Sequence, residues 1–113
     1  MALFTLMVAT KPKPGREGEW NRWYDEVHLD EVLSLSGFHR AYRLSGIGQV
    51  TPDRANVAVY EIEAEDDAGA VLVLDHLKAA ALTTTDALDP DSVTFDLYRN
   101  GASRVGSDEG GSR

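Results

Sequence analysis

Apolar residues alternate with a period of two in four segments of the chain. Residues 2–10 (ALFTLMVAT) are apolar on both faces of an extended strand, and the alternation returns in Phe38–Ser45, Ala55–Ala64 and Ser92–Arg99. This period predicts β-strands. Residues 46–54 (GIGQVTPDR) join the second and third strands and contain two glycines and a proline. They predict a β-hairpin loop.

The second predicted strand has mixed faces. Strict alternation places Phe38, Arg40, Tyr42 and Leu44 on one face, with His39 and Arg43 on the other. Arg40 would then point the same way as the strand's aromatic residues.

The stretch Trp20–Phe38 has the period of a helix, but its apolar phase changes midway. Its first apolar face carries Trp20, Trp23, Tyr24 and Val27, whereas Leu29, Val32 and Leu33 point the opposite way. A straight helix cannot bury both sets on one surface. We therefore expect a break or bend near residues 28–30, with Asp30 as the N-cap of a short second helix and Gly37 as its terminator.

A second helix is predicted over Ala70–Ala81, capped by Asp66 or Asp67. Its apolar stripe holds Ala70, Val73, Leu74, Leu77 and Ala81, and His76 lies to one side. Residues 83–90 (TTTDALDP) read as a loop.

The element order β-α-β-β-α-β predicts an α+β ferredoxin-like fold, a four-stranded antiparallel sheet with two helices on one face. This domain would span residues 1–100, and the Gly- and Ser-rich residues 101–113 would form a disordered tail. The first strand is apolar on both faces, but the predicted helices can cover only one of them, and the chain is too short to form a further layer over the other. We therefore expect a homodimer through the open sheet face.

Composition narrows the function classes. A net charge of −8 with scattered basic residues argues against nucleic acid as a partner. The chain has no cysteine, which excludes disulfides and thiolate metal sites. No apolar run approaches the roughly 20 residues of a membrane span, and the N-terminus lacks a secretory signal. The expected location is the cytoplasm, away from membranes.

His28 is the first candidate for chemistry, because the predicted bend places it beside Tyr24, Asp25 and Glu31. A histidine among such groups can act as an acid or base, unless it only ties the bend together. Metal binding is not expected, because the three histidines lie on separate elements. The other candidates that could bind a substrate each have a structural alternative, namely core packing, solvent exposure or an ion pair. They are Trp20, Trp23, Tyr24, Glu31, Arg40 (which could instead pair with Glu61 or Glu63) and His76.

The motif W-x-x-W-Y-D-x-x-H-L-x-E-V-L over residues 20–33, followed by Gly37-Phe38, resembles the EthD-type branch of the dimeric α/β-barrel superfamily. Many relatives carry proline where this chain has Asp30. The resemblance implies a pocket between the sheet and the helices, lined at the positions of Trp20, Trp23, Tyr24 and His28. The superfamily includes polyketide cyclases, muconolactone-type isomerases, cofactor-free monooxygenases and haem-binding enzymes.

The leading hypothesis is a cofactor-free enzyme that cyclises, dehydrates or isomerises a hydrophobic, aromatic or polyketide-like molecule. His28 would move the proton and Tyr24 would steady the developing oxyanion. One alternative is a cofactor-free monooxygenase or a haem-binding oxidoreductase. Another is a protein that binds a small ligand without turnover.

Overall fold

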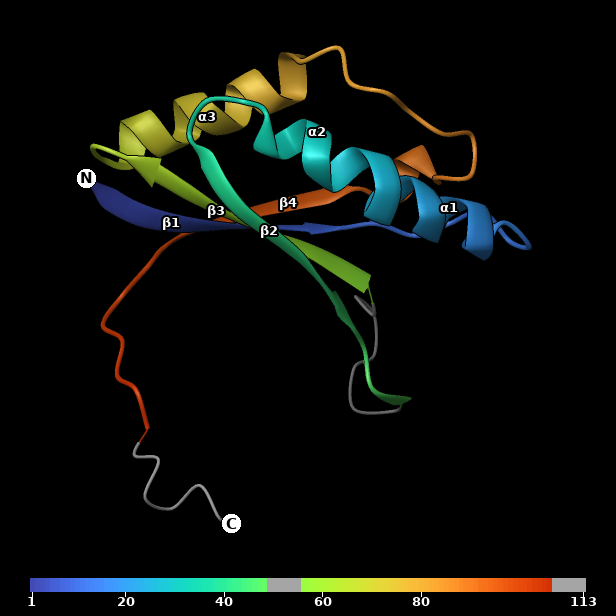
Figure 1. Ribbon diagram of the computed structural model, residues 1–113, viewed down its shortest axis with the longest axis horizontal. Coiled ribbons are helices and arrows are strands. Elements are labelled where there is room, and N and C mark those ends of the chain that lie inside the picture. The colour runs from blue at the N-terminus through green and yellow to red at the C-terminus, as the bar shows by residue number, and fades with distance from the viewer. Residues whose placement is uncertain (49–55, 107–113) are drawn as a thin grey trace.

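Four antiparallel strands form one sheet in the order β2-β3-β1-β4, and two helical arms lie together on one of its faces (Figure 1). The computed structural model describes residues 1–48 and 56–106. This is the predicted ferredoxin-like α+β fold. The elements are β1 (Ala2–Ala9), α1 (Glu17–Trp23), a π-helical turn η1 (Tyr24–His28), α2 (Leu29–Leu33), β2 (Phe38–Ser45), β3 (Asn56–Ala64), α3 (Asp67–Ala79), a 3₁₀ turn η3 (Pro90–Ser92) and β4 (Thr94–Arg99).

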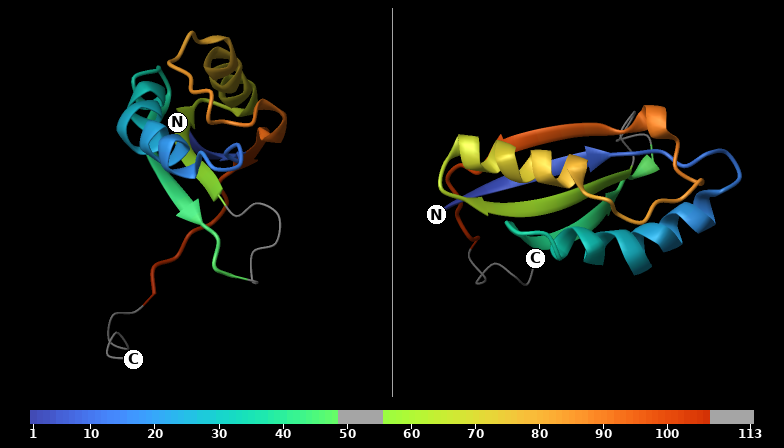
Figure 2. Two further views of the ribbon diagram at one scale, coloured as in Figure 1. Left: turned by 90° about the vertical axis from the view of Figure 1, so that its right-hand side faces the viewer. Right: turned by 90° about the horizontal axis from the view of Figure 1, so that it is seen from above.

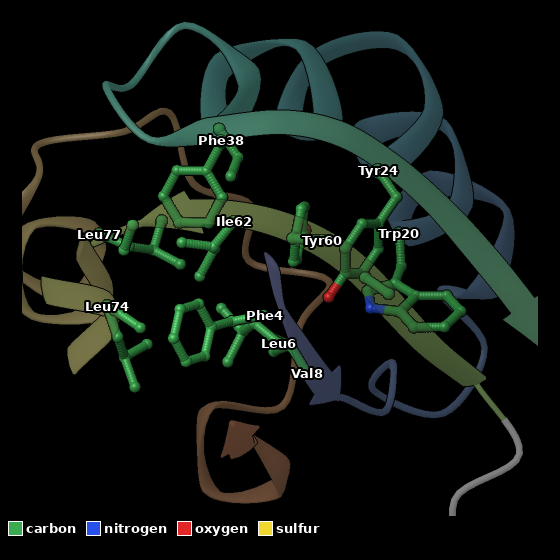
Figure 3. Packing of buried hydrophobic residues seen from close by; sticks show 14 of the residues in the cluster. Phe4, Leu6, Val8, Trp20, Tyr24, Phe38, Tyr60, Ile62, Leu74 and Leu77 are labelled. Carbon is green, nitrogen blue, oxygen red and sulfur yellow. The ribbon is translucent and has the colours of Figure 1, made fainter. Parts of the chain in front are cut away.

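The most apolar strand, β1, lies in the interior of the sheet because it pairs with both β3 and β4. Its residues Phe4, Leu6 and Val8 face the helices and are buried. Figure 3 shows these side chains interleaved with Ile62 of β3 and with apolar residues of α3. The alternation of β1 therefore builds the centre of the hydrophobic core.

The prediction that Phe38, the first residue of β2, shares a face with Arg40 and Tyr42 is wrong. Phe38 pairs with Ile62 and Arg40 with Glu61, so one extra residue, His39, is inserted in β2. Such a β-bulge shifts the alternation by one position. Phe38 consequently faces the helices, whereas Arg40 and Tyr42 face the opposite side of the sheet.

The first helical arm does not break where the sequence predicted. The N–H of Leu29 donates to the carbonyl oxygen of Tyr24, an i→i+5 bond that marks a π-helical turn. The extra residue in this turn rotates the following residues by about 100°, so Trp20, Tyr24 and Val32 all become buried. Asp30 is not an N-cap, because α2 continues from His28, whose backbone is helical (φ −69°, ψ −44°).

The second arm, α3, begins three residues earlier than predicted. Asp66 is the N-cap, and its Oδ1 accepts a hydrogen bond of 2.9 Å from the N–H of Gly69. The helix ends at Ala79, which leaves the predicted stripe residue Ala81 exposed and outside it. Gly37, in the turn after α2, adopts φ +96°, and a Cβ there would lie 2.8 Å from Cγ2 of Val73 on α3.

The helix-free face of the sheet carries large apolar side chains that are partly or largely exposed. These are Leu3, Tyr42, Leu44 and Tyr98. The expected dimer contact would use this face. Among the helices of the described ranges, none has the length and hydrophobicity needed to cross a membrane.

Two predicted segments fall largely outside the described residues. Of the hairpin loop 46–54, residues 49–54 are not described, and neither are residues 107–113 of the predicted tail. Residues 101–106 are exposed and carry neither helix nor strand. The last strand begins at Thr94 rather than Ser92, because η3 occupies the preceding positions.

Candidate functional site

A cavity of about 220 Å³ lies between the sheet, the π-helical turn and the segment that follows α3. Seen from above the helices, this segment, residues 80–89, crosses from the end of α3 towards the first helical arm (Figure 2). The cavity walls are mostly apolar. The lining residues are Val8, Thr10, Trp23, Tyr24, His28, Tyr60, Leu77, Lys78, Leu82, Thr83, Thr84, Leu88, Val93 and Phe95.

The last residue of the π-helical turn, His28, is half-buried against this cavity. The Trp23 ring stacks on the imidazole, with centroids 4.3 Å apart and planes 22° from parallel. Nδ1 of His28 is buried and has no hydrogen-bond partner in the described part of the chain. Burial lowers the pKa of His28 below its ordinary value, and the charge of Glu31 opposes this only in part. The imidazole is therefore neutral at pH 7 and able to accept a proton.

The hydroxyl of Tyr24 is already engaged. Tyr24 is 2% exposed, and its hydroxyl oxygen lies 3.0 Å from Oγ1 of Thr10, where either group can donate. Burial raises the pKa of Tyr24, and the Thr10 hydrogen bond and Arg43 oppose this rise, so the phenol keeps its proton at pH 7. A ligand would have to share Tyr24 with Thr10.

A second tyrosine of the cavity, Tyr60, was not among the predicted site residues. It lies on β3, is 1% exposed, and its buried hydroxyl has no hydrogen-bond partner among residues 1–48 and 56–106. Burial raises the pKa of Tyr60, and its proximity to Tyr24 raises it further. The alternation of Ala58, Tyr60 and Ile62 could have placed this residue on the helix-covered face.

Trp23 and Glu31 hold the wall of the cavity in place. Nε1 of Trp23 donates to the carbonyl oxygen of Thr83 over 3.0 Å. The Glu31 carboxylate accepts from the N–H of Thr83 at 3.0 Å and from its hydroxyl at 2.8 Å. The structural alternative for Glu31, that it turns to solvent or pairs with an arginine, is therefore wrong, because its carboxylate binds Thr83. Glu31 does not line the cavity, and it fixes the loop that does.

Replacing Glu31 with alanine should loosen this wall. The loss of hydrogen bonds to a charged acceptor should lower the free energy of unfolding by about 1–2 kcal/mol. Urea denaturation would measure the loss, and limited proteolysis within residues 80–89 should become faster. Asp30→Ala, which removes an adjacent exposed carboxylate, is the matched control and should leave both unchanged. Equal cleavage in both variants would contradict the role assigned to Glu31.

Three predicted binding residues lie away from the cavity. Trp20 is 2% exposed in the core, below the Arg43 guanidinium, which lies 4.9 Å from its ring centroid. Arg40 lies on the helix-free face, where Nη1 is 3.4 Å from Oε2 of Glu61, as the structural alternative predicted. His76 is exposed on α3. The structure thus brings together His28, Tyr24 and Trp23.

Charge is sparse around the cavity. With His28 neutral, only Lys78 among the described lining residues carries a charge, and its Nζ lies 4.9 Å from the Phe95 ring centroid. Within the described ranges, no group of three or more histidine or acidic side chains is arranged to hold a metal ion.

Haem, one alternative implied by the resemblance, can be tested against this space. His28 is the one histidine among the described lining residues, and Trp23 covers a face of its ring. The volume of about 220 Å³ lies below the roughly 300–1,000 Å³ of pockets that take drug-sized ligands. A porphyrin is larger than most such ligands. The residues present therefore do not fit haem in this cavity.

Comparison with known proteins supports the fold. No protein-family model matches the chain, and no curated protein sequence matches it. A solved structure from Bacillus cereus, of a protein proposed to be an antibiotic biosynthesis monooxygenase, is similar with a TM-score of 0.53. The similarity covers 94% of this chain and 100% of that one, at 14% sequence identity. What the two share is the fold. At this identity the likeness carries no residue roles.

Proposed function

We propose that this protein is a cofactor-independent monooxygenase that oxidises a small aromatic molecule with molecular oxygen. The observation that carries the proposal is a neutral, half-buried imidazole that lines an apolar cavity and whose buried Nδ1 has no hydrogen-bond partner in the described ranges. The monooxygenase name of the Bacillus cereus structure supports this choice over the cyclase, dehydratase or isomerase hypothesis. The EthD-type affiliation remains a proposal that the motif of residues 20–33 suggests.

The cavity limits the size of the substrate. An apolar cavity of about 150 Å³ in another protein holds benzene. A volume of about 220 Å³ therefore suits one or two fused rings. The Trp23 ring, which stacks on His28, supplies a flat apolar wall beside the proposed base.

In the proposed reaction, neutral His28 removes a proton from a substrate CH₂ carbon that is next to a carbonyl or joined to it through one double bond. The resulting anion is electron-rich and is oxidised by O₂. Overall, a CH₂ carbon and O₂ give a carbonyl carbon and water: two hydrogens leave the carbon, one oxygen atom enters it, and the other leaves as water. The proton held by His28 is returned as the water forms.

1-Naphthol is a suitable probe, because it has two fused rings and its 4H-keto tautomer has a CH₂ group at C4 that is joined to the carbonyl through one double bond. Its oxidation to 1,4-naphthoquinone consumes one O₂ and releases one water. An oxygen electrode should record uptake that depends on the enzyme, and ¹⁸O₂ should place one labelled atom in the quinone. Absence of uptake and label with every one- or two-ring phenol would contradict the proposal.

The same base could also serve proton transfer without oxygen, which keeps the isomerase or lyase hypothesis as the second candidate. Two results together would favour the isomerase or lyase hypothesis. The enzyme would exchange deuterium at the carbon next to the carbonyl of 1-tetralone under nitrogen, and no phenol would support oxygen uptake. Saturable binding with neither reaction would favour a carrier. We also propose that the exposed apolar residues of the helix-free face form a homodimer contact.

A further inference from the structure

One residue that lines the cavity, Tyr60, has a buried hydroxyl that nothing in the described chain satisfies. Tyr24 and Thr10 bond to each other, whereas the hydroxyl of Tyr60 is buried without a partner. A buried polar group without a hydrogen bond costs stability, and such groups are few in native proteins, so each calls for an explanation. Tyr60 lines the same cavity as His28.

We propose that Tyr60 is the specificity-determining hydrogen-bond donor of this cavity. Its hydroxyl would favour aromatic molecules that carry a carbonyl or phenolic oxygen over hydrocarbons of the same shape. The inference deepens the proposed function, and rests on it for the identity of the site. It adds the substrate feature that the apolar walls cannot recognise.

The position of Tyr60 suits a fixed donor. It lies on β3, an interior strand, where it pairs with Leu6 of β1 and Ala41 of β2. Figure 3 shows Tyr60 between Ile62 of the same strand and Tyr24 of the π-helical turn. Burial and Tyr24 both raise the pKa of Tyr60, so its hydroxyl remains a donor across the physiological pH range.

A donor at this position also fits the proposed chemistry. When His28 removes a proton next to a carbonyl, negative charge develops on the carbonyl oxygen. A hydroxyl fixed beside that oxygen binds it more strongly as the charge grows. The role that the sequence assigned to Tyr24 would thus fall to Tyr60, because the Tyr24 hydroxyl is already paired with Thr10.

The test compares two ligands of the same shape, 1-tetralone and its hydrocarbon tetralin, by ligand-observed NMR under nitrogen. Wild-type protein should bind the ketone about tenfold more tightly than the hydrocarbon. In Tyr60→Phe the ketone should lose about that factor, while tetralin should bind within twofold of its wild-type affinity. Tyr98→Phe, which removes an exposed hydroxyl on the helix-free face, is the control and should keep the preference.

Thermal unfolding separates this role from a structural one. Because the Tyr60 hydroxyl has no partner in the described chain, Tyr60→Phe should unfold at the wild-type temperature or higher. A less stable or unfolded variant would show that the hydroxyl is bonded within the protein, and would overturn the proposal. An unchanged ketone preference would overturn it as well. Neither result depends on turnover, so failure of the monooxygenase proposal would be seen separately, as absent oxygen uptake.

Discussion

Replacing His28 with alanine should reduce oxygen uptake with 1-naphthol by about 10²–10⁴-fold, the usual contribution of a general base. No other neutral nitrogen base lies among the described lining residues, since Lys78 is the remaining basic side chain there. The fold should persist, because the buried Nδ1 has no hydrogen-bond partner in the part of the chain that is described, so alanine removes only ring contacts with Trp23 and Tyr24. Circular dichroism would check this alongside the oxygen electrode.

The matched control is His76→Ala, which removes an exposed histidine of α3 and should keep wild-type uptake. His28→Gln would preserve much of the side-chain volume without the base, and should be as inactive as His28→Ala. Wild-type uptake in either His28 variant would refute the assignment. An unfolded His28→Ala would mean that the ring is structural.

The pH dependence of the wild type gives a second readout of His28. Burial places its pKa below 6.5 in the folded protein, so kcat/KM should fall on the acid side with a midpoint below that value. Between the folded and unfolded pKa values the unfolded chain binds more protons. The free energy of unfolding should therefore decrease as the pH drops below about 6.5. His28→Gln should lack this part of the slope.

Deleting Glu26 should destabilise the protein by at least about 3 kcal/mol, because it removes the extra residue of the π-helical turn. The arm would revert to a regular α-helix, and everything after the deletion would rotate by about 100° relative to Trp20. Either Trp20 or Val32, each at most 2% exposed, must then leave the core. Urea denaturation would measure the loss.

The control for this deletion is Glu26→Ala, which removes the same exposed side chain but keeps the residue count. It should stay within about 0.5 kcal/mol of wild type, as surface substitutions usually do. If the deletion were equally mild, the phase of the arm would not depend on the π-helical turn, and the account of how both apolar sets become buried would be wrong.

Only part of the candidate site could be predicted from the sequence. The motif of residues 20–33 located Trp23, Tyr24 and His28, because an aromatic stripe and a phase change are visible in the spacing of residues. The position of Tyr60 on the helix-covered face of the sheet could have been predicted from strand alternation. The wall formed by residues 80–89 was not, because it is held by hydrogen bonds from Trp23 and Glu31 to Thr83, which join segments about fifty or more positions apart.

Local patterns in the sequence determined the four strands, the two helical arms, an aspartate cap at position 66 or 67 and hence the ferredoxin-like order, since each depends on neighbours a few residues away. Tertiary structure decided three further points: that the phase change became a π-helical turn instead of a break, that a bulge at His39 turned Phe38 towards the helices, and that Tyr60, whose hydroxyl has no partner in the described chain, lines the same cavity as His28. The physical reason is common to all three. Each depends on which distant residues compete for the same buried space, and that competition begins only when the sheet and both arms are packed together.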